Sequence, residues 1–256
     1  MESSPDKRPA ETGEEIDFGF RRVDPADHPS LVRGVFDSVA RRYDLMNDLM
    51  SGGLHRVWKS ALLDRLAPRA GMMLLDVAGG TGDIATGFLK RGGGDALICD
   101  INQEMLLAGL DRSFDRGDVH GPGRICGDAA TLPVQQFSMD SCTIAFGLRN
   151  VTRRTDALVE MHRVLKPGGH FICLEFSPAV LPQLKSIYDA YSFKVLPWLG
   201  QQIASDRDSY AYLAESIRKF PAPDDLSAEM LLAGFGNIRQ TPMTGGIVWM
   251  HSGWRV

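Results

Sequence analysis

The sequence has few cysteines and histidines, and it has no long hydrophobic run. Its 256 residues include 4 cysteines and 6 histidines, and neither a CxxC nor an HExxH pattern occurs. We therefore expect no metal site, and we expect reduced cysteines that pack as small core residues in a reducing compartment. No run of about 18 uncharged apolar residues is present, so no segment is expected to span a membrane.

The chain also lacks an excess of charge of either sign. Lys and Arg number 28 against 32 Asp and Glu, which gives a net charge of −4. This balance provides no general attraction to nucleic acid, so no nucleic-acid partner is expected. The first twenty residues have neither an apolar signal core nor the basic composition of a transit peptide, which predicts a cytoplasmic address.

Residues 1–28 are polar and show no hydrophobic periodicity. This composition is typical of a disordered or loosely docked tail. A single domain is expected over residues 29–256. Its first part should be helical, because apolar residues recur at helical spacing over residues 32–46, after the candidate N-cap Ser30, and again over residues 54–62.

From residue 72 onward, short apolar runs alternate with helical segments. This alternation predicts βαβ units and a parallel sheet. Strands are expected at residues 72–77, 96–100, 124–126, 142–146 and 171–176, with two late ones at 237–241 and 247–250. Helices are expected at residues 84–90, 104–112 and 156–165, and after the fifth strand at 184–195, 210–220 and 227–232.

A glycine-rich turn follows the first of these strands. Residues 76–83 read DVAGGTGD, so glycines lie where the strand must turn into a helix. Glycine lets backbone N–H groups approach a ligand closely, and the helix N-terminus adds partial positive charge. A tight structural turn or a dinucleotide-binding enzyme would give a similar pattern, so this loop alone does not identify the ligand.

Polar residues at or just after the ends of two strands narrow the choice of ligand. Asp100 ends the second strand about twenty residues after the glycines, where a carboxylate can accept both hydroxyls of a ribose. A helix cap for the segment that starts at Asn102 is the alternative. Asp128 and Ala129 follow the third strand, where a polar side chain next to a small one can accept the exocyclic amine of an adenine and leave room for the ring.

The order of the motifs DVAGGTGD, CDIN, GDAATLP, FSMDSCTIAFGLRN and LKPGGHFICLE resembles the class I methyltransferases that use S-adenosyl-L-methionine. More narrowly, YDLMN at residues 43–47 and RVLKPGG at residues 163–169 resemble the ubiquinone/menaquinone biosynthesis C-methyltransferase family, over about residues 32–256. The resemblance implies an α/β, Rossmann-like fold with a seven-stranded, mostly parallel sheet. It also implies helices on both faces and extra helices at the N-terminus and after the fifth strand.

The same resemblance implies a reaction and a set of cofactor contacts. The reaction is C-methylation of a polyprenylated quinol ring, either 2-polyprenyl-6-methoxy-1,4-benzoquinol or demethylmenaquinol. Family members often carry Asn at position 128 and Ser at position 145, so the chain departs from the family at both places and lacks a hydroxyl at 145. The implied contacts with S-adenosylmethionine are Gly79 and Thr81 in the glycine loop, Asp100 at the ribose, Asp128 and Ala129 at the adenine, and Ala145 beneath the methionine part.

Candidates for catalysis follow the fourth strand. Forming a phenolate at pH 7 from a phenol with a pKa of about 10 costs roughly 4 kcal/mol. Arg149 stays protonated, so we expect it to stabilise the phenolate or polarise a water, while Asn150 orients that water or the quinol oxygen. A loop-anchoring ion pair and cap is the alternative for this pair. Tyr43 lies in a helical region that could close over the site as a lid, and core packing is its alternative.

The prenyl tail of such a substrate would lie in a bilayer. The stretch 184–199 is the candidate for an apolar tunnel wall or for a peripheral membrane contact at the inner face, with core packing as the alternative. A homodimer and a larger quinone-synthesis complex are both compatible with the sequence. Three other functions remain open: an O- or N-methyltransferase on the same fold, a nicotinamide-dependent oxidoreductase, and a non-catalytic scaffold that binds S-adenosylmethionine.

Overall fold

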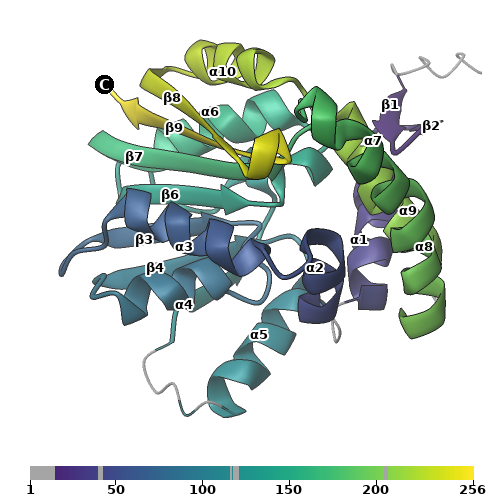
Figure 1. Ribbon diagram of the computed structural model, residues 1–256. Coiled ribbons are helices and arrows are strands. Elements are labelled where there is room, and N and C mark those ends of the chain that lie inside the picture. Colours follow the sequence, from purple (N-terminus) through teal and green to yellow (C-terminus); the bar gives the residue numbers. More distant parts are fainter. Residues whose placement is uncertain (1–14, 40–42, 116, 118–120, 205–206) are drawn as a thin grey trace, which may run out of the picture.

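The centre of the protein is a seven-stranded sheet, shown by a computed structural model that describes residues 15–39, 43–115, 117, 121–204 and 207–256 (Figure 1). The strand order is β5-β4-β3-β6-β7-β9-β8, and β9 runs antiparallel to both of its neighbours. The sequence prediction of a mostly parallel seven-stranded sheet is therefore confirmed. The strands are β3 (Met73–Val77), β4 (Asp95–Asp100), β5 (Gly123–Cys126), β6 (Met139–Ala145), β7 (Leu165–Phe176), β8 (Phe235–Met243) and β9 (Val248–Arg255).

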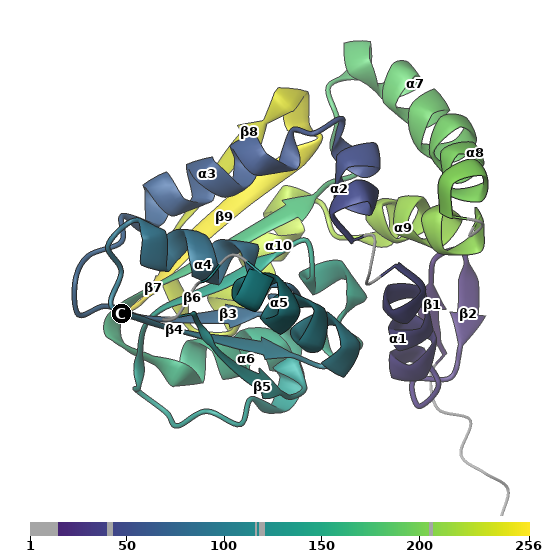
Figure 2. The ribbon, with the colours of Figure 1, turned by 90° about the horizontal axis from the view of Figure 1, so that it is seen from below.

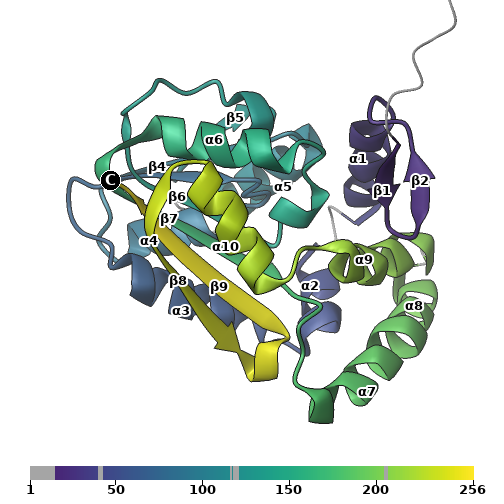
Figure 3. The same cartoon turned by 90° about the horizontal axis from the view of Figure 1, so that it is seen from above.

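Helices cover both faces of the sheet, as Figures 1 and 3 show. Each face has its own apolar cluster: Leu62 and Phe88 belong to one, and Leu158 and Met230 to the other. Central strands of a parallel sheet are buried on both faces, which explains why they read as continuous apolar runs. One face carries α3 (His55–Leu66), α4 (Asp83–Lys90) and α5 (Gln103–Asp115), and the other carries α6 (Arg154–Val164) and α10 (Pro223–Leu232).

A second group of elements lies beyond the carboxyl ends of the parallel strands (Figures 2 and 3). It includes two helices, over residues 28–39 and 43–51, where the apolar spacing over residues 32–46 predicts one, and it includes the helices predicted over residues 184–195 and 210–220; the helix predicted over residues 54–62 is α3, on a face of the sheet. Its members are α1 (His28–Val39), α2 (Tyr43–Ser51), α7 (Pro182–Ala190), α8 (Leu196–Leu199) and α9 (Arg207–Lys219), with π-helical turns on either side of α8. We call this group the cap. It places side chains over the edge of the sheet where ligands bind in this architecture.

The N-terminal tail is shorter than the sequence suggests. Residues within the expected tail form an antiparallel hairpin, β1 (Ile16–Phe18) and β2 (Arg21–Val23), and α1 begins at His28. Ser30 is therefore not an N-cap; it lies inside α1, and its hydroxyl donates to the carbonyl of Asp27 at 2.7 Å. Strands of three residues are too short to show periodicity, so the sequence pattern could not reveal them. Residues 1–14 lie outside the described part of the chain.

The cysteines also depart from the expectation in one place. All four are free, and three of them, Cys99, Cys142 and Cys173, are buried in strands, as predicted. Cys126 is exposed at the end of β5. This strand is an edge of the sheet, so the last residue of the strand has no layer to cover it.

Candidate functional site

The glycine loop between β3 and α4 has an unusual backbone. Ala78, Gly80 and Gly82 all have positive φ values, of 50°, 53° and 89°. A Cβ atom at Gly80 would lie 2.9 Å from the terminal methyl of Met105, so no larger residue fits there without movement. The loop thus brings backbone N–H groups to the carboxyl end of the sheet and to the start of α4, an arrangement that suits an anionic or strongly polar ligand group.

Asp100 ties this loop to the next strand. Its side chain is buried, with the residue 8% exposed, and its two oxygens accept from the backbone N–H groups of Gly80 and Asn102, each at 2.8 Å. Burial raises the pKa of Asp100 to about 6. Asn102 is the residue that closes the N-terminus of α5, because its side-chain oxygen accepts from the N–H of Met105 at 3.0 Å. Asp100 therefore lies at the predicted strand end and holds the glycine loop as well.

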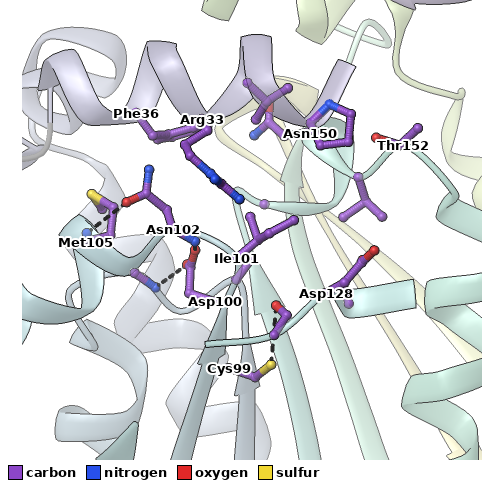
Figure 4. Close-up of a pocket in the computed structure, with 18 of the residues that line it drawn as sticks. Arg33, Phe36, Cys99, Asp100, Ile101, Asn102, Met105, Asp128, Asn150 and Thr152 are labelled. Carbon is purple, nitrogen blue, oxygen red and sulfur yellow. Dashed lines mark hydrogen bonds between the residues drawn. The ribbon is translucent and has the colours of Figure 1, made fainter. Parts of the chain in front are cut away.

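A cavity of about 440 Å³ opens between these loops and the cap (Figure 4). This volume is within the usual range of about 300–1,000 Å³ for small-molecule and cofactor sites. The side chain of Asn102 donates to Asp37 on α1 at 2.7 Å, which holds α1 across the top. Residues from the sheet side include Gly80, Asp100, Ile101, Asp128 and Ala129, and residues from the cap include Pro29, Val32, Arg33 and Phe36.

Asp128 lies on the wall of this cavity and caps the short turn Ala129–Thr131. One carboxylate oxygen accepts from the N–H of Ala130 at 2.8 Å, and the other lies 3.6 Å from the guanidinium of Arg153. An Asn side chain would supply the same capping oxygen, so the departure from the family at this position preserves the turn. Asp128 and Ala129 thus lie together at the large cavity, as the resemblance implies.

The other expected cofactor residues lie beside a smaller cavity. Gly79, Thr81 and Ala145 line it, and the hydroxyl of Thr81 accepts from Arg112 at 3.3 Å. Ala78 lines both cavities, so the two meet at the glycine loop.

The small cavity also contains a charged group that the sequence analysis did not select. Asp76 accepts from the hydroxyl of Thr143 at 2.8 Å, its second oxygen is buried without a hydrogen-bond partner, and burial raises its pKa to about 7. Lys59 and Asp83 form an ion pair of 2.6 Å in the same wall. The position of Asp76 at the head of the glycine motif was a usable signal, whereas nothing in the sequence pointed from α3 to this cavity.

Arg149 forms a buried ion pair that anchors its loop, which is the alternative given for it in the sequence analysis. Its side chain is only 2% exposed, and it donates to a carboxylate oxygen of Glu175 at 2.6 Å and to the carbonyl of Phe146 at 2.7 Å. Its guanidinium carbon lies 5.6 Å from the ring centre of Phe176. Arg149 borders a separate polar cavity of about 240 Å³, on the side of the loop where His28 and Tyr212 lie.

Asn150 follows directly and lines the large cavity (Figure 4). Its side-chain oxygen accepts from the hydroxyl of Tyr212 at 3.1 Å. Its side-chain nitrogen is buried and has no hydrogen-bond partner. The structure thus supplies an unused donor at the edge of the cavity. The backbone of Tyr43 begins α2, and its side chain lies outside the described part of the protein.

Within the described ranges, no group of three or more His, Cys, Asp or Glu side chains is placed to hold a metal ion. Over the same ranges, no helix has both the length and the apolar composition needed to cross a membrane.

Comparison with known proteins assigns the family. The model of the ubiE/COQ5 methyltransferase family matches residues 24–255. The chain belongs to this family. It is 51% identical to the ubiquinone/menaquinone biosynthesis C-methyltransferase UbiE of Paracoccus denitrificans, over 94% of this chain and 97% of that protein. It is also 51% identical to the UbiE of Methylobacterium nodulans, over 94% of this chain and 96% of that protein.

Solved structures agree in fold with this member of the ubiE/COQ5 methyltransferase family. An S-adenosylmethionine-dependent methyltransferase of Thermotoga maritima, described as a possible histamine N-methyltransferase, has a TM-score of 0.63 at 16% identity, over 88% of this chain and all of that one. Phosphoethanolamine N-methyltransferase 2 of Haemonchus contortus has a TM-score of 0.60 at 17% identity, over 83% of this chain and 46% of that one. At such low identity these likenesses establish the class I methyltransferase fold alone.

Proposed function

We propose that this protein transfers a methyl group from S-adenosylmethionine to a ring carbon of a polyprenylated quinol, in the biosynthesis of ubiquinone, menaquinone or both. The relatives at 51% identity bear the name of that activity, and the chain spans almost their whole length. The observation in the structure that best supports the proposal is one cavity lined by both Asp100 and Asn150, with the amide nitrogen of Asn150 buried and without a hydrogen-bond partner.

The residues present fit the cofactor. Asp100 has two carboxylate oxygens with room for further donors, such as ribose hydroxyls, beside the glycine loop. Asp128 and Ala129 stand where an adenine would be read, and the buried oxygen of Asp76 without a partner suits an ammonium group in the smaller cavity. We therefore assign Gly79, Thr81 and Ala145 to the methionine end. When bound, S-adenosylmethionine supplies an electrophilic methyl group.

The residues after β6 act on the quinol. The side-chain nitrogen of Asn150 donates to the quinol oxygen and stabilises negative charge as the hydroxyl passes its proton to water. The ring carbon then bonds to the methyl group as the bond from sulfur to that methyl breaks, and the proton on the methylated carbon leaves to water, which restores the aromatic ring. Phenolate formation at pH 7 costs roughly 4 kcal/mol, so even a partial stabilisation accelerates attack by the ring carbon. Arg149, the residue before Asn150, keeps this loop in place through its ion pair with Glu175. Holding the ring carbon in line with the methyl group contributes roughly 7–11 kcal/mol more.

Tyr43 is proposed as a contact on the cap side of the quinol. Its helix, α2, packs against both α3 and α8, so the helix stands between the sheet and the outer helices. A Tyr43→Phe variant with lower quinol turnover and unchanged cofactor affinity would support this role, and equal turnover would leave Tyr43 as a packing residue.

The outer helices of the cap are proposed as a peripheral membrane contact. Large apolar side chains are exposed over the stretch 184–199, among them Leu184 at 37%, Phe193 at 39% and Trp198 at 59%. Such side chains would let the protein rest on the bilayer that holds the prenyl tail. Flotation with phosphatidylethanolamine/phosphatidylglycerol vesicles should decrease for Trp198→Glu and not for Leu232→Glu, a control on α10 with 87% exposure. Equal flotation of both variants would contradict the membrane contact. The assembly of this protein with a second copy or with other quinone-synthesis enzymes stays a prediction.

The function is tested by a quinone profile of cells that lack this protein, before and after it is restored. A ubiquinone precursor short of one ring methyl identifies the benzoquinol reaction, and demethylmenaquinone identifies the naphthoquinol reaction. An unchanged profile in cells with no redundant enzyme rejects the proposal. Purified protein with either quinol and labelled S-adenosylmethionine separates methylation on carbon from methylation on oxygen, because the two products differ in their NMR spectra.

A further inference from the structure

We infer that Tyr212 is a positioning residue for quinol methylation, and that the N-terminal hairpin β1–β2 holds Tyr212 in place. The inference rests on the proposed function, since it concerns the donor that Asn150 presents to the quinol. Tyr212 belongs to α9, in the cap, whereas Asn150 follows β6 of the sheet. Their contact joins the two parts of the molecule at the cavity.

The Tyr212 hydroxyl holds the side chain of Asn150. It lies 3.1 Å from the side-chain oxygen of Asn150 and donates to it. This bond ties Asn150, a residue that lines the large cavity, to a helix of the cap. The side-chain nitrogen of Asn150 is buried and has no hydrogen-bond partner. A buried donor without an acceptor is unfavourable, so an acceptor on a ligand in this cavity would stabilise it.

Tyr212 remains a hydrogen-bond donor over the physiological pH range. Tyr212 is 5% exposed, and burial raises the pKa of its hydroxyl above the usual value. The charged groups that face it are Arg149, which lowers this pKa, and Glu175, which raises it, and they form an ion pair with each other. The hydroxyl therefore keeps its proton over the physiological range and remains a donor to Asn150.

The β1–β2 hairpin packs against the ring of Tyr212 and holds it in place. Phe18 of β1 stacks on that ring with centroids 4.2 Å apart and planes 20° apart, and Phe18 is itself 4% exposed. One turn further along α9, Glu215 accepts from the N–H of Phe20 at 3.0 Å. Gly19, which lies between Phe18 and Phe20 in the hairpin, has a φ of +60°, and a Cβ atom there would lie 2.3 Å from the Glu215 carboxylate. The hairpin is thus joined to α9 at Tyr212 and at Glu215.

The first test is Tyr212→Phe, which removes the hydroxyl and keeps the ring that stacks on Phe18. We expect kcat/KM for the quinol to fall about tenfold, with the Kd for S-adenosylmethionine unchanged within about twofold. Ser216→Ala is the matched control, because it removes a buried hydroxyl from the same helix, one that donates to Leu213 at 3.0 Å and makes no contact with Asn150. Its kinetics should equal those of the wild type.

A double-mutant cycle separates positioning from general damage to the fold. If Tyr212 acts through Asn150, then Tyr212→Phe combined with Asn150→Ala should be no slower than Asn150→Ala alone. Phe18→Leu, which removes the stacked ring, should lower kcat/KM for the quinol in the wild type and have no further effect in Tyr212→Phe/Asn150→Ala. Additive losses in these cycles would overturn the inference.

Other outcomes also test the positioning role of Tyr212. Wild-type kinetics for Tyr212→Phe, in a preparation whose wild type methylates the quinol, overturns the positioning role and leaves the proposed function intact. A wild-type protein that methylates neither quinol overturns both. A fall in cofactor affinity equal to the fall in kcat/KM would assign Tyr212 to the stability of the site as a whole, against the inference.

Discussion

The two sides of the large cavity are built in different ways. On the cofactor side, the carboxylate of Asp100 joins Gly80, which is 20 positions away, and Asn102, which is 2 positions away. On the proposed substrate side, Asn150 lines the cavity and is held by Tyr212, 62 positions away, and the hairpin joins the same helix through Phe20 and Glu215, 195 positions apart. The first side is made from consecutive strand ends, and the second depends on contacts of the sheet, the cap and the hairpin that only folding brings together.

This difference indicates which side should vary between enzymes of the same fold. Strand ends and a glycine turn are fixed by the sheet, so a cofactor site built there accompanies the fold. The cap contributes side chains through long-range contacts, which can change without disturbing the sheet. Substitutions on the two sides should therefore affect different measured quantities, and four of them test that expectation.

The largest effect is expected for Arg149→Ala, in the loop that follows β6 and precedes Asn150. It leaves the carboxylate of Glu175, whose side chain is 2% exposed, buried without its cation. Loss of one partner from a buried pair costs about 3–5 kcal/mol in the free energy of unfolding. Quinol turnover should fall at least tenfold, with little change in cofactor affinity. Denaturant unfolding and steady-state kinetics measure these effects.

Replacing both partners of that pair sharpens the result. Arg149→Met combined with Glu175→Met should recover most of the lost stability, because no unpaired charge remains buried. It should not recover turnover if Arg149 contributes its charge to the reaction. A loss of less than about 1 kcal/mol in Arg149→Ala would contradict the buried-pair account, and full activity would reject a catalytic contribution.

The next effect concerns Asp76 and depends on pH. Its pKa is raised to about 7 in the folded protein from an ordinary 3.8, so the folded state binds one more proton than the unfolded state between these values. Its contribution to stability is thus full below pH 4 and is lost as the pH rises through 7. Relative to Asp76→Asn, the free energy of unfolding should fall by up to about 1.4 kcal/mol per pH unit in this window.

Unfolding by urea at a series of pH values, without ligand, measures this difference. The raised pKa of Asp100 is present in both proteins and cancels in the comparison. Parallel stability curves for the wild type and Asp76→Asn would show that the carboxyl of Asp76 titrates normally. This would remove the argument that its buried oxygen awaits a cationic partner.

A smaller and more selective effect is expected for Asp100→Ala. The substitution removes the acceptor for two backbone donors and, in the proposed function, for the ribose hydroxyls, so cofactor affinity should weaken by about 1–3 kcal/mol. Titration calorimetry measures it. Wild-type affinity should also weaken below pH 6, because the pKa of about 6 means that the carboxylate is protonated there. Unchanged affinity would restrict Asp100 to holding the glycine loop.

The smallest effect is expected for Arg153→Ala at the rim of the cavity. Its guanidinium lies 3.6 Å from Asp128, with side chains that are 53% and 42% exposed. Solvent screens such pairs, so stability should change by less than about 1 kcal/mol, and quinol kinetics should not change. Thermal unfolding and the same kinetic assay test this. A large loss would show that the rim takes part in the site.

Local patterns predicted the sheet well. The expected first strand, residues 72–77, agrees with Met73–Val77 within one residue, and the helices on both faces appear where apolar spacing placed them. The expected fifth strand, residues 171–176, was too short, because β7 already begins at Leu165 and passes through the Lys-Pro-Gly-Gly segment. A strand that contains Pro and Gly gives no continuous apolar run, so its pattern is visible only in part.

The site was predicted unevenly for the same reason. Asp100, Asp128 and Ala129 could be placed because Asp100 ends a recognisable strand and the other two closely follow the next one, and the structure brings them to one cavity. The ion pair of Arg149 with Glu175 was considered only as an alternative, because no local pattern identifies a partner 26 positions away. Tyr212 was visible only as one residue of a helix.

The sequence by itself determined the sheet, the glycine turn and the acidic strand end, because apolar periodicity, glycine conformation and strand order act over short distances along the chain. Only the tertiary structure decided the hairpin against α9, the buried pair at Arg149, and the contact of Asn150 with Tyr212. These contacts form between residues that meet after the sheet and the cap have packed together, and their stability comes from burial and hydrogen-bond direction, which no local pattern encodes.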